Sequence, residues 1–298
     1  MPASDRTVLA AGAPETLAEA VRRLTAAFRA ADLETPERDA RILVTEIVGC
    51  TPSTLITEPQ RIVPPEAARR LDDALRRRLG REPVARILGQ RGFYGRDFVV
   101  TPAPLDPRPD TETIVEAALA MAGREGWRDR PIRILDIGTG SGALLVTLLA
   151  ELPNAHGLGT DIDPAALTVA KTNAEHLGVA HRASWQVATS LEGIAGPFDL
   201  LVSNPPYIPS ADIAGLEPEV GRFDPHIALD GGADGLAVYR EILAGAAAVV
   251  PGGWLLLEVG RGQASAVLQI AAAQGLRNPT SFRDLAGMER CVAVRSQL

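Results

Sequence analysis

The four residues Asn204-Pro205-Pro206-Tyr207 are the ones whose types and order point most directly to chemistry. They follow residues 198 to 203, an apolar run that predicts a buried strand. A planar amide, two rigid prolines and an aromatic ring therefore stand at a strand end. An enzyme that alkylates a flat, weakly nucleophilic nitrogen needs such a set, because carbonyl acceptors must hold its N–H groups while a ring stacks on its plane. That nitrogen can belong to a nucleobase or to a side-chain amide.

The same four residues also have a purely structural interpretation. X-Pro-Pro is a common way to leave a strand, since both prolines fix φ and lack an N–H donor. The residues upstream of this segment bear on the choice between the two interpretations.

A glycine-rich turn lies about seventy residues before this segment. The β-branched run Ile132 to Ile137 enters Gly138, Thr139, Gly140, Ser141 and Gly142, and residues 143 to 150 have helical composition. The glycines allow a close backbone approach to a ligand, and the helix that follows offers free N–H groups. The spacing is not the G-x-G-x-x-G of dinucleotide sites. No phosphate-binding lysine follows the turn either, because Lys171 is the only lysine.

Asp161 ends the next predicted strand, residues 155 to 160, about twenty residues after the glycine turn. A carboxylate at this place can accept hydrogen bonds from both hydroxyl groups of a ribose. Its structural alternative is an ordinary turn residue. Asp163 and Pro164 then have the pattern of an N-cap and a first helical turn, which predicts a helix from Ala165 to Leu177.

The order of these motifs resembles that of the class I methyltransferases that use S-adenosylmethionine. The Asn-Pro-Pro-Tyr strand end narrows the resemblance to enzymes that methylate planar nitrogens. Elsewhere the chain alternates strands and helices, which predicts an α/β fold with a doubly wound, mostly parallel sheet and a late antiparallel strand. The ends of the strands that carry Gly138, Asp161 and Asn204 then meet at one edge of that sheet.

Composition limits the class of protein. The hydrophobic content of 46% suits a globular domain, and no apolar stretch is long enough for a membrane span or a signal peptide. We therefore expect a cytoplasmic protein without a membrane partner. Cys50 and Cys291 are too few for a disulfide framework, and the four histidines lack ligand spacing, so we expect no metal site.

The charge is unevenly distributed along the chain. The net charge is −7, and the first 90 residues hold 14 arginines against 13 acids, which leaves 16 basic against 24 acidic residues in the rest. Proteins that grip duplex DNA usually present a basic face. The acidic predicted catalytic part therefore argues against a nucleic-acid substrate.

Three segments are expected. Residues 1–88 form a helical bundle, residues 89–112 a hairpin and a Pro-rich linker, and residues 113–298 the methyltransferase domain. The linker, Leu105 to Glu112, has two prolines around Arg108 and two carboxylates after it, which favours a fixed loop near a site. Its alternative is a rigid spacer with an N-cap box at Asp110 or Thr111. The Arg76 to Arg78 cluster is either a partner surface or a favourable helix end.

Over nearly its full length, the chain resembles the release factor glutamine methyltransferases, the PrmC (HemK) family. The linker and the Gly-Gly-x-Asp-Gly-Leu stretch are the most specific signals. The matching segments are Pro107 to Glu112, Gly138 to Gly142, Asn204 to Tyr207, Leu216 to Val220, Ala228 to Leu236, Glu258 to Gly260 with Gln263, and Arg283 to Gly287.

The resemblance implies a seven-stranded Rossmann-like methyltransferase sheet beside a small helical domain that recognises the substrate. It implies methyl transfer from S-adenosylmethionine to the glutamine of the Gly-Gly-Gln loop in class 1 peptide chain release factors. The glycine turn, Asp161 and Asn204 would hold the cofactor. Asn204 and the Pro205 carbonyl would accept the two N–H bonds of the glutamine amide, and Tyr207 would flank it. Pro206 and Arg108 are also expected to be substrate-binding residues.

One departure from the family lies after the third strand. An acidic residue is usual there and can meet the adenine amino group, but this chain has Ala188, Thr189 and Ser190. Thr189 can still accept a hydrogen bond through its hydroxyl. We therefore place Thr189 and Ser190 at the cofactor.

Two other functions remain open from the sequence. The first is methylation of the exocyclic amine of adenine in nucleic acid, because that group also presents a flat NH₂ to Asn-Pro-Pro-Tyr. The second is an inactive methyltransferase fold that serves as a binding scaffold. Cofactor binding separates the second from an enzyme, and the identity of the methylated molecule separates the first from the glutamine reaction.

Overall fold

The computed structural model describes residues 14–297, and the chain divides between Leu88 and Gly89 into two compact units. Within residues 14–297, no helix is long and apolar enough to cross a membrane.

The first unit is a helical bundle. Its helices are α1 (Leu17–Ala30), α2 (Pro36–Val48), α3 (Thr54–Thr57), α4 (Pro65–Leu79) and α5 (Val84–Leu88). Thr16 and Glu19 form a capping box at the start of α1, and the left-handed Gly49 ends α2. A buried ion pair joins Asp39 of α2 to Arg78 of α4 at 2.8 Å. The bundle is therefore held by an apolar core and by this buried ion pair.

The second unit begins with a β-hairpin and continues as alternating strands and helices. The hairpin pairs β1 (Gln90–Phe93) with β2 (Arg96–Val99) around Tyr94-Gly95. The remaining elements are η1 (Pro109–Thr111), α6 (Glu112–Arg124), β3 (Ile132–Ile137), α7 (Ala143–Glu151), β4 (Ala155–Asp161), α8 (Pro164–His176), η2 (Ala180–Arg182), β5 (Ala183–Val187), β6 (Leu200–Ser203), η3 (Ser210–Gly215), α9 (Pro218–Gly221), η4 (His226–Ala228), α10 (Ala237–Val249), β7 (Trp254–Glu258), α11 (Ala264–Ala273), β8 (Arg277–Arg283) and β9 (Glu289–Arg295).

Seven of these strands form one sheet in the order β5-β4-β3-β6-β7-β9-β8. The pairs among β3, β4, β5, β6 and β7 are parallel, whereas β9 is antiparallel to both β7 and β8. The predicted doubly wound, mostly parallel sheet with a late antiparallel strand is confirmed. The direction of the strand order reverses between β3 and β6, and this is the switch point where such sheets bind ligands.

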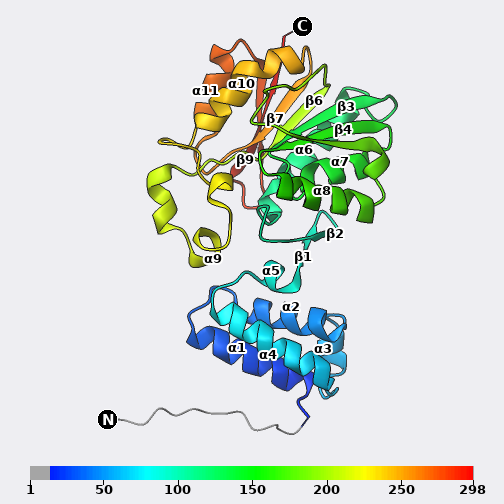
Figure 1. Ribbon diagram of the computed structural model, residues 1–298, viewed down its shortest axis with the longest axis vertical. Helices are drawn as coiled ribbons and strands as arrows, with labels where there is room; N and C mark the ends of the chain where they lie inside the picture. Colours follow the sequence, from blue (N-terminus) through cyan, green and yellow to red (C-terminus); the bar gives the residue numbers. More distant parts are fainter. Residues whose placement is uncertain (1–13, 298) are drawn as a thin grey trace. The chain divides into compact units, whose positions relative to one another are not determined.

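Both faces of the sheet are covered, as Figure 1 shows. Helices α6, α7 and α8 pack on one face, and α10 and α11 pack on the other. The alternation along the strands explains this arrangement, since Leu200 and Val202 of β6 enter the first core while Leu201 enters the second.

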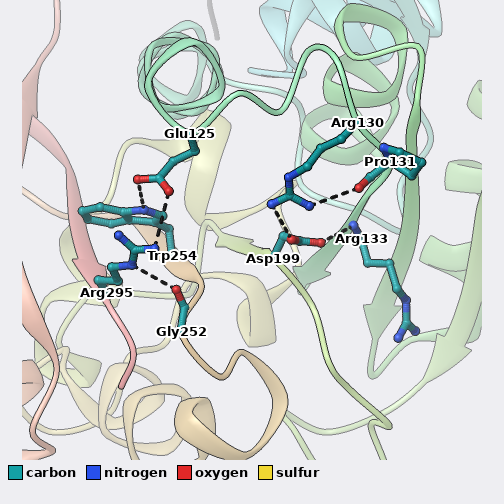
Figure 2. A network of polar contacts seen from close by, with 8 residues as sticks. All are labelled: Glu125, Arg130, Pro131, Arg133, Asp199, Gly252, Trp254 and Arg295. Carbon is teal, nitrogen blue, oxygen red and sulfur yellow. Dashed lines mark hydrogen bonds and ion pairs between the residues drawn. The ribbon is translucent and has the colours of Figure 1, made fainter. Parts of the chain in front are cut away.

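Polar contacts fasten the amino ends of the central strands, at the edge opposite the strand ends that carry the predicted motifs (Figure 2). The Asp199 carboxylate, just before β6, accepts hydrogen bonds at 2.9 Å from the Arg130 guanidinium and from the Arg133 backbone N–H. Nearby, Glu125 accepts a hydrogen bond from the Trp254 indole at 3.1 Å and faces Arg295. The first set of contacts joins the loop after α6 to β3 and to the residue before β6. The second set joins the end of α6 to β7 and β9.

The elements that the sequence did not predict include one strand and one short helix. The edge strand β8 carries the mostly polar and exposed residues Arg277 to Arg283, so it lacks the apolar alternation that reveals a strand. The short helix α5 follows Pro83 and has too few residues to show a helical period.

We expect Asp39→Ala to destabilise the first unit by about 3 to 5 kcal/mol, because it leaves the buried Arg78 guanidinium without this carboxylate. Chemical denaturation of the whole chain, followed by circular dichroism, measures the loss. Asp73→Ala is the matched control, since Asp73 pairs with Arg76 at 2.9 Å on the exposed surface of α4. Its effect should stay below about 1 kcal/mol. Equal losses in the two variants would contradict the assignment.

Candidate active site

A cavity opens at the carboxyl ends of β3, β4, β5 and β6, with a volume of about 240 Å³. All but one of the residues predicted for cofactor binding line it: Gly138, Thr139, Gly140, Ser141, Asp161, Thr189, Ser190 and Asn204. The exception is Gly142, which lies behind the turn against α8. Of the predicted substrate residues, Arg108 and Pro206 line it too. The fold thus brings the three sequence motifs and the linker to one place.

The glycine turn owes its shape to left-handed backbone angles. Gly138, Gly140 and Gly142 have φ values of +67°, +55° and +81°, which residues with a Cβ rarely adopt. One Asp161 oxygen accepts the Gly140 N–H and the other accepts the Asp163 N–H, each at 2.9 Å. Burial raises the pKa of Asp161. The carboxylate is therefore fixed beside the turn, and each oxygen keeps a lone pair for a ligand hydroxyl.

Asp136, the fifth residue of β3, is a second cavity carboxylate that the sequence analysis did not single out. It is 1% exposed and accepts a hydrogen bond from the Thr139 hydroxyl at 2.6 Å. Its other oxygen has no hydrogen-bond partner within residues 14–297. Burial raises the pKa of Asp136 to about 7. The signal in the sequence that could have identified Asp136 is an acidic residue inside an apolar strand that precedes a glycine turn.

The cavity also has an apolar end. Ile162, Ala188 and Ile227 line it, and 47% and 58% of the surfaces of Ile162 and Ile227 are exposed. Ser190 follows with a left-handed φ of +54°. This apolar lining suits a flat apolar ring. Thr189 and Ser190 line the cavity too, and the buried Ser190 hydroxyl has no hydrogen-bond partner in the described residues.

The Gly-Gly-x-Asp-Gly stretch supports Asn204 to Tyr207 from behind. A Cβ on Gly235 would lie 2.4 Å from the Tyr207 carbonyl oxygen, and one on Gly231 would lie 2.8 Å from that of Pro206. The Gln263 side chain donates to the Tyr207 carbonyl at 2.9 Å and accepts the Gly260 N–H at 3.0 Å. Only glycine permits this close packing, so the stretch fixes the strand end.

Tyr207 lies between charged groups rather than on the cavity wall. Burial raises the pKa of the Tyr207 hydroxyl to about 12, with Glu258 raising it further and Arg290 opposing that effect. The phenol is therefore neutral near pH 7 and cannot serve as a base there.

The linker is held by a different partner at each polar residue. Arg108 forms an ion pair with Asp224, and Asp110 pairs with Arg290 of β9 at 2.9 Å. The Glu112 carboxylate accepts the Tyr94 N–H of the hairpin at 2.8 Å. These contacts favour the interpretation of the linker as a fixed loop at a site.

The alternative prediction is confirmed for the position of Thr111 as the N-cap of α6, but the expected side-chain capping bond is absent. Thr111 and Arg108 occupy the cap positions of α6 and η1, and neither makes a side-chain capping bond. The Thr111 hydroxyl instead accepts a hydrogen bond from the Asn204 Nδ2 group at 3.1 Å.

Glu258, the last residue of β7, is a buried carboxylate behind the cavity wall and is 2% exposed. Burial raises the pKa of Glu258 to about 7, while hydrogen bonds from Thr111 and Asn204 lower it. In the strand Trp254 to Glu258, four apolar residues are followed by an acid. This pattern is the signal in the sequence that could have identified Glu258 as a site residue.

Two family models match the chain. The model of the PrmC N-terminal domain matches residues 19–89, and the methyltransferase small domain matches residues 127–214.

Curated proteins match over most of the chain. The release factor glutamine methyltransferase of Rhodospirillum rubrum is 50% identical over 90% of this chain and 81% of its own length. That of Bradyrhizobium diazoefficiens is 46% identical over 94% of this chain and 95% of its own length. The chain belongs to the release factor glutamine methyltransferase family. It is therefore a methyltransferase.

Solved structures agree on the fold of this family member. The hMettl16 catalytic domain in complex with MAT2A 3'UTR hairpin 6 matches with a TM-score of 0.54 at 16% identity, over 80% of this chain and 85% of that one. The same domain in complex with hairpin 1 matches with a TM-score of 0.51 at 18% identity, over 82% and 88% of the two chains. At such identity the likeness concerns the fold alone.

Gly235→Ala should lower the methyl-transfer rate by about 10- to 100-fold, because the Tyr207 carbonyl has to move and the strand end moves with it. Initial rates with labelled cofactor measure the effect. Gly178→Ala is the matched control: its φ of +75° resembles the +72° of Gly235, but a Cβ there meets no atom within 4 Å. Both variants carry left-handed strain of about 1 to 2 kcal/mol. A similar rate loss in both would show that strain alone is responsible.

Proposed function

We propose that this methyltransferase transfers a methyl group from S-adenosylmethionine to the side-chain nitrogen (N5) of the glutamine in the Gly-Gly-Gln motif of class 1 peptide chain release factors. The names of its curated relatives support the release factor and its glutamine as substrate. The observation that carries the proposal is the position of the Asn204 amide, at the wall of an acidic cavity beside a glycine turn.

The cavity fits this cofactor by its charge and shape. Asp136 and Asp161 place two carboxylates beside the turn, which favours a ligand with ammonium and sulfonium groups over a phosphate. The unpartnered Asp136 oxygen suits the ammonium group, and Asp161 suits the ribose hydroxyls. The apolar lining with Ile162 and Ile227 suits the adenine ring, and Thr189 is another residue of the cavity lining. When bound, the cofactor supplies an electrophilic methyl group on a sulfonium.

The amide nitrogen of glutamine is a poor nucleophile, because its lone pair is delocalised into the carbonyl. Asn204 and the Pro205 carbonyl are proposed to accept its two N–H bonds and thereby aim the nitrogen at the methyl group. The same two acceptors stabilise the positive charge that grows on the nitrogen during attack. Each acceptor is worth about 1 to 3 kcal/mol, or roughly one to two decades in rate. Tyr207 and Pro206 restrict the approach, and no acid–base pair is needed.

We assign recognition of the release factor outside its glutamine loop to the helical unit of residues 1–88. Its match to the PrmC N-terminal domain supports that role. Arg108 lines the cavity and is proposed to contact the substrate, while its pairing with Asp224 holds the loop before α10.

In the direct test, the wild-type enzyme should transfer labelled methyl to a purified class 1 release factor and not to the factor whose loop glutamine is replaced by alanine. Asn204→Ala should lower the rate by at least about tenfold, since one of the two acceptors is lost. Scintillation counting and mass spectrometry of the loop peptide locate the label. A short Gly-Gly-Gln peptide should react more slowly than the whole factor, because it lacks the contacts with residues 1–88.

An adenine-containing duplex serves as the competing substrate in the same assay. Label on the duplex and not on the factor would overturn the proposal in favour of adenine methylation. Cofactor binding without label on either molecule would overturn it as well.

The affinity for S-adenosylmethionine should rise about tenfold from pH 6 to pH 8, because the ammonium group needs an ionised Asp136 and burial raises the pKa of Asp136 to about 7. Calorimetry in two buffers of different ionisation enthalpy should show proton release near pH 6. In Asp136→Asn the binding should weaken, and this part of the pH dependence should vanish.

The same shift has a consequence for the protein without ligand. The folded state favours the neutral Asp136, so its stability falls as the pH rises from the unfolded pKa of about 4 through about 7. Asp136→Asn should therefore be the more stable protein at pH 8 although it binds the cofactor less well. An unchanged pH profile of binding in this variant would refute the role of Asp136.

A further inference from the structure

The Asn204 amide is held from one end only. Its Nδ2 group donates to the Thr111 hydroxyl at 3.1 Å. Thr111 and Asn204 both lower the pKa of the neighbouring Glu258 carboxyl by hydrogen bonding, and Glu258 Oε2 has no hydrogen-bond partner in the described residues. The Asn204 Oδ1 atom accepts no hydrogen bond from any residue in the range 14–297. Thr111 and Glu258 are 5% and 2% exposed, so water cannot replace them as partners. The carbonyl end of the amide is thereby left for a ligand in the cavity.

The direction of these hydrogen bonds follows from the groups themselves. An ionised carboxylate only accepts hydrogen bonds, so whenever Glu258 is ionised the single hydroxyl proton of Thr111 is the one it can draw from that side chain. The lone pairs of the Thr111 hydroxyl can then only accept, and the NH₂ end of Asn204 is the group that donates to them. Turning the amide over would bring its carbonyl oxygen against the oxygens of Thr111 and Glu258. The turned amide would also present NH₂ to the NH₂ of a substrate glutamine.

We propose that Thr111 and Glu258 are positioning residues, which hold the Asn204 amide with its carbonyl oxygen toward the methyl acceptor. The inference rests on the proposed function for the nature of that acceptor. It concerns two residues that are proposed to act through Asn204; Glu258 does not line the cavity, whereas Thr111 is part of its wall.

Each positioning residue is fixed by its own part of the fold. The ion pair between Asp110 and Arg290 and the bond from Tyr94 to Glu112 hold the residues on either side of Thr111. Glu258 is the last residue of β7, and its backbone carbonyl accepts the Tyr239 hydroxyl at 2.7 Å. The hydroxyl and the carboxylate therefore come from two rigid elements, η1 and β7, that enclose the amide.

The state of Glu258 depends on pH in this arrangement. The titratable and charged groups that face it are Asp110 of η1, Tyr207 of the strand end, Tyr239 of α10, and Arg290 and Cys291 of β9. Burial raises the pKa of Glu258 to about 7. Below that pH the carboxyl group carries a proton that it can donate, so it no longer forces Thr111 and Asn204 into one direction. The turnover number should fall on the acid side for this reason.

The test compares Thr111→Val, which keeps the shape and removes the hydroxyl, with Thr111→Ser, which keeps the hydroxyl. Thr111→Val should lower kcat for the release factor by about tenfold or more, as loss of a supporting hydrogen bond does at comparable sites. Thr111→Ser should keep kcat within about threefold of wild type. Glu258→Gln should lower kcat and flatten its acid limb. The Kd for S-adenosylmethionine should stay within about twofold in all three variants, which also shows that they fold.

Thr147→Val is the matched control, because Thr147 is a fully buried threonine of α7 whose hydroxyl has no hydrogen-bond partner in the described residues. Its kcat should equal that of wild type. If Thr111→Val behaves like Thr147→Val while wild type is active, the positioning role is overturned and the proposed function stands.

A second measurement does not depend on activity. The side-chain NH₂ of Asn204 is assigned by nuclear magnetic resonance from the signal that Asn204→Ala removes, and its hydrogen exchange is followed. Exchange should be slow in wild type and at least about tenfold faster in Thr111→Val, because the acceptor is lost. If wild type methylates no release factor, the proposed function fails, and this exchange ratio alone decides the positioning role. Equal exchange in the two proteins would overturn it.

Discussion

The parallel pairing of β3 with both β4 and β6 is the constraint on which the site depends. Ile137 lies opposite Thr160 of β4 and Ser203 of β6, so the three strands end at one level. A glycine turn, a carboxylate and an amide therefore open into one cavity. The buried Ser203 hydroxyl donates to the Ile137 carbonyl at 2.7 Å and secures the level. A slip by one residue would turn the side chains of β6 to the opposite faces and remove Asn204 from the cavity.

The linker turns this edge of the sheet into a specific site. Loops are usually the mobile part of a fold, but here Arg108, Asp110, Thr111 and Glu112 each contact a different element. The orientation of Asn204 thus depends on residues almost a hundred positions away in the chain. A site that is ordered before the substrate arrives has less conformational entropy to lose on binding.

Burial of charge links stability to function in this protein. Asp136 and Glu258 both lie in the interior, and burial raises the pKa of each to about 7. Retaining such groups lowers the stability of the free protein, because a buried carboxylate has lost its hydration. Under the proposed function, a cationic cofactor at Asp136 offsets that loss when the site is filled, whereas the Asn204 amide offsets part of the cost at Glu258 already in the free protein.

The sequence predicted the features that local rules determine. Residues 132–137, 155–160 and 200–203 show strand patterns, and the Gly138 to Gly142 turn and Asn204 have types that fit only a few uses. It did not reveal β8, whose polar residues lack a strand pattern, and it offered an N-cap role for Thr111. Only the tertiary structure decided that Thr111, Asn204 and Glu258 meet. Their contact joins η1, a loop after β6 and the end of β7, and no pattern within one segment records such a long-range pairing.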